Sequence, residues 1–137
     1  RGAGSDNHQG VAARVTLPDY DEVDDILATA SGRNEPPLIA LLDCIQDPHN
    51  FGAILRTAEG AGVHGVLIPK DNAAPMTPAV FKASAGAAAH VAVARITNLS
   101  RTMAELKEKG FWFTGADEEP AALALAAAWA ALREASR

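Results

Sequence analysis

The stretch that decides the fold runs from Leu38 to Pro69 and reads LIALLDCIQDPHNFGAILRTAEGAGVHGVLIP. It begins and ends with short apolar runs, Leu38–Cys44 and Gly65–Pro69, which are typical of strands buried on both faces of a parallel sheet. Between them, residues 47–63 have the spacing of a helix. The sequence therefore predicts a strand, a helix and a parallel strand. In such a unit the loop after the first strand, Asp47 to Asn50, is the usual place for ligand chemistry.

The predicted helix has a stripe that should pack on the sheet. Ile54, Ala58 and Ala61 follow the i, i+4, i+7 spacing of such a stripe. Asn50 is a suitable N-cap, and Gly62 stands where a helix stop is expected.

Another face of this helix presents one arginine between two glycines. Arg56 lies one turn after Gly52 and one turn before Gly60. Because glycine costs about 1 kcal/mol relative to alanine inside a helix, two of them indicate that another group approaches this backbone closely. The alternative is a solvated face with a weak pair between Arg56 and Glu59, and spacing alone does not decide between the two.

The rest of the chain continues the alternation of strands and helices. Two further strands are predicted, at Val91–Arg95 and Phe111–Thr114. An acidic helix is predicted at Pro18–Leu27, and a crossover at Thr77–Ala89 with Val80 facing the sheet. The next helix is capped by Asn98 or Ser100, ends near Lys109 and stops at Gly110. An alanine-rich helix is predicted at Ala121–Arg137. Four strands without a hairpin signal predict an α/β fold, with helices on both faces of a parallel sheet.

Composition limits the class of protein. With 137 residues, of which 48% are hydrophobic, the chain can form one domain with a real core. Its one cysteine, Cys44, excludes a disulfide framework and favours a cytoplasmic location. No apolar run approaches the roughly 20 residues of a membrane span, and no signal-peptide pattern is present. We expect no metal site, because the four histidines lack ligand spacing.

The string from Asp47 through Val63 resembles the first signature motif of the SpoU (TrmH-like) RNA ribose 2′-O-methyltransferases, a branch of the knotted SPOUT methyltransferases. It has Asp, Pro, Asn, Gly, Arg, Thr, Ala, Glu and the closing Gly-Val in one register. The resemblance extends over about residues 7–116 and is greatest to members that methylate a guanosine ribose of large-subunit ribosomal RNA. The further segments that carry it are Asn7–Val15, Val63–Asp71, Lys82–Ala88 and Arg95–Thr102.

The resemblance implies an activity and a set of site residues. The expected enzyme transfers a methyl group from S-adenosylmethionine to a ribose 2′-hydroxyl of RNA, has a trefoil-knotted SPOUT fold and acts as a homodimer. The family assigns the catalytic role to the arginine that matches Arg56 and RNA contacts to the asparagine that matches Asn50. Because a guanidinium stays protonated, we interpret Arg56 as stabilising a developing alkoxide, with Glu59 orienting it. Gly115 and Ala116 would border the cofactor.

Charge is distributed unevenly along the chain, although the formal net charge is −5. Residues 1–47 carry three basic and nine acidic side chains, residues 48–109 seven and four, and residues 110–137 two and four. A basic central segment fits a local footprint for RNA phosphates. The candidate RNA-binding cations are Arg56, Lys82, Arg95 and Arg101, each of which could equally be a solvated surface charge.

The resemblance breaks near the end of the chain. We expect residues 1–15 to end an interdomain linker and start the catalytic domain, and residues 16–137 to form a methyltransferase domain that is incomplete after about residue 119. Family members continue with a Gly-x-Glu-x-x-Gly loop and a Pro-Met strand before Ser-Leu-Asn, segments that tie the knot and hold the cofactor, and neither follows here. Either a segment between about Glu118 and Leu125 is missing from this sequence, which we favour, or the protein carries a natural or engineered deletion, or the residues of the terminal helix are poorly assigned.

Two other functions fit part of the pattern. A non-catalytic RNA-binding or dimerisation module with the same fold would explain the missing cofactor motifs. A generic nucleotide-binding α/β domain fits less well, because no glycine-rich phosphate loop follows the first strand.

Overall fold

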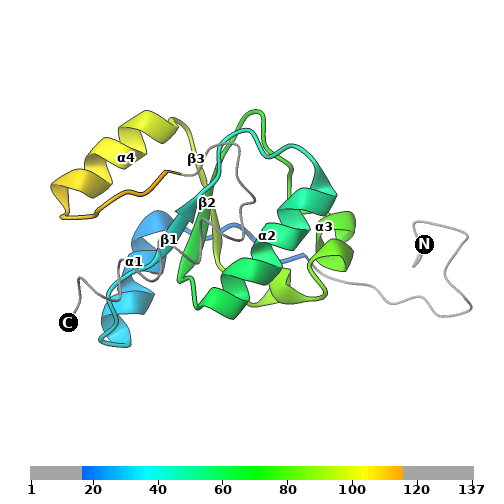
Figure 1. Ribbon diagram of the computed structural model, residues 1–137, viewed down its shortest axis with the longest axis horizontal. Coiled ribbons are helices and arrows are strands. Elements are labelled where there is room, and N and C mark those ends of the chain that lie inside the picture. The colour runs from blue at the N-terminus through cyan, green and yellow to red at the C-terminus, as the bar shows by residue number, and fades with distance from the viewer. Residues whose placement is uncertain (1–16, 116–137) are drawn as a thin grey trace, which may run out of the picture.

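Three short parallel strands form the centre of the computed structural model, which describes residues 17–115 (Figure 1). Helices alternate with these strands along the chain. The elements are α1 (Val23–Gly32), β1 (Ile39–Leu41), α2 (Pro48–Ala61), β2 (Gly65–Pro69), α3 (Pro78–Ala83), the short 3-10 helix η1 (Ala87–Ala89), β3 (Val93–Ile96) and α4 (Leu99–Glu108).

The strands lie in the order β1-β2-β3 and all pairs are parallel. Ala40 pairs with Val66, and Leu67 pairs with Ala94. The middle strand β2 is the most buried, and its Val66 and Leu67 are fully buried. The predicted parallel sheet is therefore confirmed. Apolar strands of this kind are stable only where both faces of the sheet are covered.

Helices cover both faces of the sheet, as predicted. In Figure 1, α2 and α3 lie on one side of the strands, and α1 and α4 lie on the other. Two hydrophobic clusters correspond to these two layers. The first includes Phe51, Leu55, Val66, Val80 and Val93, and the second includes Ile26, Leu67, Ala94, Ile96 and Leu106.

Local sequence explains both ends of α2. The predicted stop at Gly62 is confirmed, because this residue ends the helix with φ 75°, a left-handed conformation that glycine adopts without strain. The predicted N-cap was wrong. Asp47, not Asn50, caps the helix, and its carboxylate accepts a hydrogen bond from the Asn50 backbone N–H at 2.9 Å. Pro48 at the first helical position fixes the start of the helix, and so places Asp47 at the cap.

The two glycines beside Arg56 have different surroundings. A Cβ placed on Gly52 would lie 2.5 Å from the Ala83 Cβ and 2.8 Å from the backbone nitrogen of Ser84, so α3 itself makes the close approach. A Cβ on Gly60 would meet nothing within 4 Å. The close approach inferred from Gly52 is therefore a helix packing contact inside the domain, and it gives no support to Arg56 as a binding group.

The segment before α1 differs from the prediction. The acidic helix begins at Val23 and not at Pro18, and it extends to Gly32. Residues ahead of it instead run beside β3, where the Asp21 backbone N–H donates to the Val93 carbonyl at 2.8 Å and Asp21 forms an isolated parallel bridge with Ala94. This segment pairs with the outer edge of β3, because the backbone N–H and C=O groups of an edge strand are strong hydrogen-bonding groups.

The predicted strand at Phe111–Thr114 was also wrong. These residues pair with no strand among those that the structure describes. Phe111 and Phe113 pack onto the cluster between the sheet and α1 and α4, whereas Trp112 is 88% exposed. The alternating aromatic pattern thus determines which side chains are buried, but it does not determine whether the segment pairs with a strand.

A buried histidine fastens the chain between α1 and β1 to the turn before β2. The His64 side chain is 4% exposed, and its Nδ1 accepts the Leu38 backbone N–H at 3.0 Å. The ring proton therefore lies on Nε2, which donates to the Glu35 carboxylate at 2.7 Å. Both ring nitrogens of His64 thus bind the segment between α1 and β1.

We expect His64→Ala to lower the free energy of unfolding by about 2 kcal/mol, because it removes the acceptor of a part-buried backbone N–H. Glu35→Gln is the control: its amide oxygen can still accept from Nε2, so the loss should stay below about 1 kcal/mol. Urea unfolding followed by far-UV circular dichroism measures both. Equal stability of His64→Ala and the unchanged protein would contradict the fastening role.

Several predictions fall outside the described residues. They concern the segment Asn7–Val15, the boundary near residue 15, Ala116, the helix at Ala121–Arg137 and the knot-forming region. Within residues 17–115, no helix is long and apolar enough to cross a membrane.

Candidate functional site

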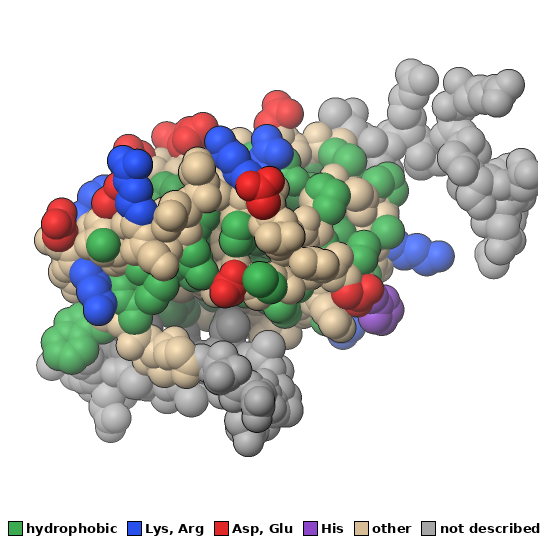
Figure 2. All heavy atoms as spheres, turned by 90° about the horizontal axis from the view of Figure 1, so that it is seen from above, with side chains coloured by type: hydrophobic (Ala, Val, Ile, Leu, Met, Phe, Trp, Pro, Cys, Tyr) green, Lys and Arg blue, Asp and Glu red, His purple; other side chains and the backbone are tan. Residues whose placement is uncertain are grey.

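The loops that follow the strands lie at the top of Figure 1, where α2 also begins. Figure 2 looks down on this face and shows acidic and basic side chains side by side over much of it. The loop after β1 contains Cys44, which has φ 55° and was wrongly placed in a strand by its apolar neighbours. Asp43 accepts a hydrogen bond from the Cys44 thiol at 3.4 Å, and this bond together with the carboxylate charge raises the pKa of the thiol. Cys44 is thus kept as a neutral thiol at neutral pH.

The three residues predicted to be catalytic all lie on α2 and are exposed. Asn50 stands in the first turn, next to the Asp47 cap, and Arg56 and Glu59 follow in the next turns. Because successive helical residues are about 100° apart, Arg56 and Glu59 project toward the α3 side, and Asn50 projects away from it. One helix therefore presents all three groups, but it does not bring Asn50 and Arg56 onto one face.

Arg56 is free of carboxylate partners in the described part of the chain. The ion pairs found there join His64 with Glu35, Arg101 with Glu105 and Lys109 with Asp24. Glu59 thus forms no ion pair with Arg56 among residues 17–115. The predicted orienting role of Glu59 requires a movement of the side chains, and it stays a prediction.

The other predicted RNA-binding cations are distributed over both layers. Lys82 is exposed in the last turn of α3, beside α2. Arg95 extends from β3, and its Cζ lies 4.2 Å from the centroid of the Tyr20 ring. Arg101 lies on α4, which covers the other face, and its Nε donates to Glu105 at 3.0 Å. The structure thus places Lys82 and Arg56 in the layer of α2 and α3, and Arg101 in the other layer.

Lys70 is a further exposed basic residue, at the carboxyl end of β2, and sequence reasoning did not single it out. It follows β2 directly, is exposed, and its backbone N–H donates to the Ile96 carbonyl at 2.9 Å. This bond places Lys70 beside the residue that follows Arg95. Its position directly after a buried strand was the signal that could have identified it. The residues that follow parallel strands lie together at the carboxyl edge of the sheet.

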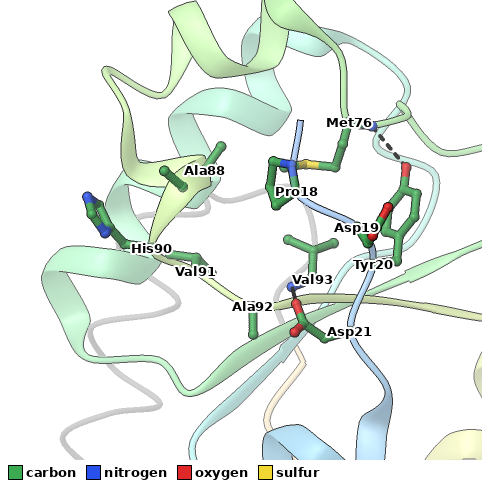
Figure 3. Close-up of a pocket in the computed structure, with 11 residues that line it drawn as sticks. Pro18, Asp19, Tyr20, Asp21, Met76, Ala88, His90, Val91, Ala92 and Val93 are labelled. Atoms are coloured by element: carbon green, nitrogen blue, oxygen red, sulfur yellow. Dashed lines mark hydrogen bonds between the residues drawn. The ribbon is translucent and has the colours of Figure 1, made fainter. Parts of the chain in front are cut away.

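A hollow of about 220 Å³ lies between the segment before α1 and the start of β3 (Figure 3). Asp19, Tyr20, Met76, His90 and Val93 contribute to its lining. None of the residues predicted to be catalytic lines this hollow. It is therefore separate from the signature helix.

The structure gives no support to Gly115 as a residue that borders S-adenosylmethionine. Gly115 is exposed and lies in the irregular segment after α4, and Ala116 is outside the described residues. Neither the 220 Å³ hollow nor the second one, between α1 and α4, includes Gly115. Within the described ranges there is also no group of three His, Cys, Asp or Glu side chains that could hold a metal ion.

Known proteins that are similar to this chain are named as RNA methylases or methyltransferases. The model of the SpoU rRNA Methylase family matches residues 37–133. A Bacillus subtilis protein named putative TrmH family tRNA/rRNA methyltransferase YacO is 50% identical over 110 residues, which are 80% of this chain and 44% of that protein. The 23S rRNA (guanosine-2′-O-)-methyltransferase RlmB of Vibrio cholerae is 50% identical over 112 residues, which are 80% of this chain and 44% of RlmB.

One solved structure adds a bound cofactor to this comparison. The SpoU methyltransferase AviRb from Streptomyces viridochromogenes, in complex with the cofactor AdoMet, has a TM-score of 0.54 and 25% sequence identity to this chain. The match covers 67% of this chain and 34% of AviRb. This chain spans less than half the length of the curated relatives and of that structure.

Proposed function

Because the chain belongs to the SpoU rRNA methylase family, we propose that its activity is methyl transfer to a ribose 2′-hydroxyl of RNA. S-adenosylmethionine is the proposed methyl donor, and a guanosine of large-subunit ribosomal RNA is the proposed target. The identity to RlmB, whose name states that reaction, supports the target, and the AdoMet complex of AviRb supports the donor. A cytoplasmic location and a homodimer are parts of the same proposal.

The observation that carries the proposal is the position of Arg56. It is exposed on α2, inside the signature segment and without an ion-pair partner among residues 17–115. A guanidinium in this state has its N–H donors available for a phosphate or for the oxygen from which a proton leaves. Because it stays protonated, Arg56 acts by stabilising negative charge on the 2′-oxygen and not by removing the proton.

Asn50 has the second role in the proposed site. Its backbone N–H is used by Asp47, which leaves its exposed side-chain amide free to bind RNA. An amide has both donors and an acceptor, and can therefore bind a ribose hydroxyl or a base edge. We assign to Asn50 a contact to the RNA and to Arg56 the stabilisation of the reacting oxygen.

A methyl-transfer assay tests the proposed function. The chain is incubated with S-adenosylmethionine labelled in the methyl group and with ribosomal RNA that lacks ribose methylation. We expect label on a guanosine ribose of the large-subunit RNA. The same RNA with a 2′-deoxy nucleotide at that site should accept none. Label on a base, and none on ribose, would contradict the proposed reaction.

A non-catalytic RNA-binding or dimerisation module is the second candidate. It is favoured by the absence of the two family cofactor motifs from the sequence and by the exposed position of Gly115. Its RNA-facing residues would be the same, so RNA binding alone does not separate the two candidates.

Calorimetric titration of S-adenosylmethionine into the chain separates them. The methyltransferase predicts saturable heat with a micromolar Kd, which corresponds to about −8 kcal/mol of binding free energy. S-adenosylhomocysteine, which has the same groups without the methyl, is the matched ligand and should compete. No heat with either ligand, in a chain that still binds RNA, would favour the module.

A further inference from the structure

A tyrosine and an arginine from distant parts of the sequence are stacked at the outer edge of the sheet. Arg95 is exposed on β3, and its guanidinium carbon lies 4.2 Å from the centroid of the Tyr20 ring. At this distance the ring attracts the cation. The stack therefore holds the long Arg95 side chain in one place.

Tyr20 is itself fixed on two sides. Its hydroxyl accepts the Met76 backbone N–H at 2.9 Å, as Figure 3 shows, and so joins it to the loop between β2 and α3. The next residue, Asp21, binds β3 twice: its backbone N–H donates to the Val93 carbonyl at 2.8 Å, and its carboxylate accepts the Val93 N–H at 3.1 Å. The ring is thus a fixed support for Arg95.

The guanidinium on this support still has its hydrogen-bond donors. Arg95 has no ion pair and no side-chain hydrogen bond to the residues described between 17 and 115. A guanidinium that stacks on an aromatic ring uses its face, so its N–H donors stay available in the plane of the group. A second exposed cation, Lys70, follows the middle strand β2, two residues after Ile68, which is paired with Arg95.

We propose that Tyr20 positions Arg95 to bind a phosphate of the RNA backbone. This inference rests on the proposed function, because it names the residue that prepares one contact of that RNA site. A planar fork of N–H donors matches the oxygens of a phosphate, and a side chain held in advance loses less rotamer entropy on binding. The bound partner is a nucleic-acid phosphate, and a protein carboxylate would be the competing ligand.

The test is a double-mutant cycle on RNA binding by the chain. Fluorescence anisotropy with a short labelled RNA hairpin is measured over a range of salt concentrations. Arg95→Gln should weaken binding about tenfold and reduce the slope of log K against log salt by about 0.7 to 0.9, the value for one lost phosphate contact. Tyr20→Leu should weaken binding about threefold, whereas Tyr20→Phe, which keeps the ring and loses only the bond to the Met76 N–H, should weaken it less than Tyr20→Leu does.

The cycle separates positioning from a general loss of structure. In the Arg95→Gln background, Tyr20→Leu should have no further effect, because the group that it positions is gone. Arg33→Gln, an exposed arginine beside α1, is the matched control and should bind as the unchanged chain does. Each variant is checked by circular dichroism, and Arg95→Gln changes only an exposed side chain.

Several results would overturn the inference. Unchanged binding by Arg95→Gln would show that Arg95 binds no phosphate, and equal effects of Tyr20→Leu with and without Arg95 would show that the tyrosine acts elsewhere. Both results are compatible with methyl transfer by the chain, so the proposed function would stand. Absence of both RNA binding and methyl transfer in the unchanged chain would overturn the proposed function together with this inference.

Discussion

Replacing Arg56 with alanine should lower the rate of methyl transfer to RNA by about a hundredfold to a thousandfold. The reason is that the guanidinium would stabilise negative charge that develops on the 2′-oxygen only as the reaction proceeds. An interaction made mainly in the transition state lowers kcat when it is removed and has a smaller effect on binding. RNA affinity should therefore fall no more than about tenfold, the value of one phosphate contact.

Two further variants test whether the charge alone is sufficient at this position and whether loss of any exposed cation lowers the rate. Arg56→Lys keeps the charge and loses the planar fork, so its rate should lie between those of Arg56→Ala and the unchanged chain. Lys107→Ala removes an exposed cation from the last turn of α4, on the other face of the sheet, and should leave the rate unchanged. Single-turnover kinetics with saturating RNA measures the chemical step. A wild-type rate for Arg56→Ala would remove Arg56 from the mechanism.

Gly52→Ala should lower the free energy of unfolding by about 2 to 3 kcal/mol, although it adds one methyl group in a helix. The added Cβ would lie 2.8 Å from two backbone atoms, the Ala83 carbonyl carbon and the Ser84 nitrogen, and 2.5 Å from the Ala83 Cβ. None of these atoms belongs to a flexible side chain, so α2 and α3 must move apart. The loss should therefore exceed the gain in helix propensity, which is about 1 kcal/mol.

Gly60→Ala is the matched variant on the same helix. Its Cβ would meet nothing within 4 Å, and Gly60 is exposed. Only the propensity changes, so the free energy of unfolding should rise by about 0.5 to 1 kcal/mol. Chemical unfolding of both variants measures the difference, and destabilisation by Gly60→Ala as large as that by Gly52→Ala would contradict the packing account.

Local pattern was sufficient wherever the partner of a residue lies close in the sequence. The apolar runs around 38–44 and 65–69 contain β1 and β2, Gly62 ends α2, and the cap of α4 is Asn98, one of the two candidates left open. Each of these depends on spacing within a few residues. The error at Asn50 has the same origin, because Pro48 makes Asp47 the better cap.

Local pattern failed where the partner comes from elsewhere in the chain. Phe111 and Phe113 alternate as in a strand, but they pack on the cluster that includes Ile26 and Leu106 without pairing with a described strand. Gly52 indicated a close approach, but only the packing of α3 on α2 showed that the approaching group is Ala83. The stack of Tyr20 and Arg95 joins residues that no motif connects.

The sequence by itself determined the family, the parallel α/β architecture and the exposed arginine of the signature helix, because these depend on residue types in one register. Only the tertiary structure decided which of the predicted cations lie in the same layer, that Tyr20 lies against Arg95, and that Lys70 is bonded to the end of β3. The physical reason is distance: side-chain contacts between separate elements depend on strand order and helix packing, which residue spacing does not contain.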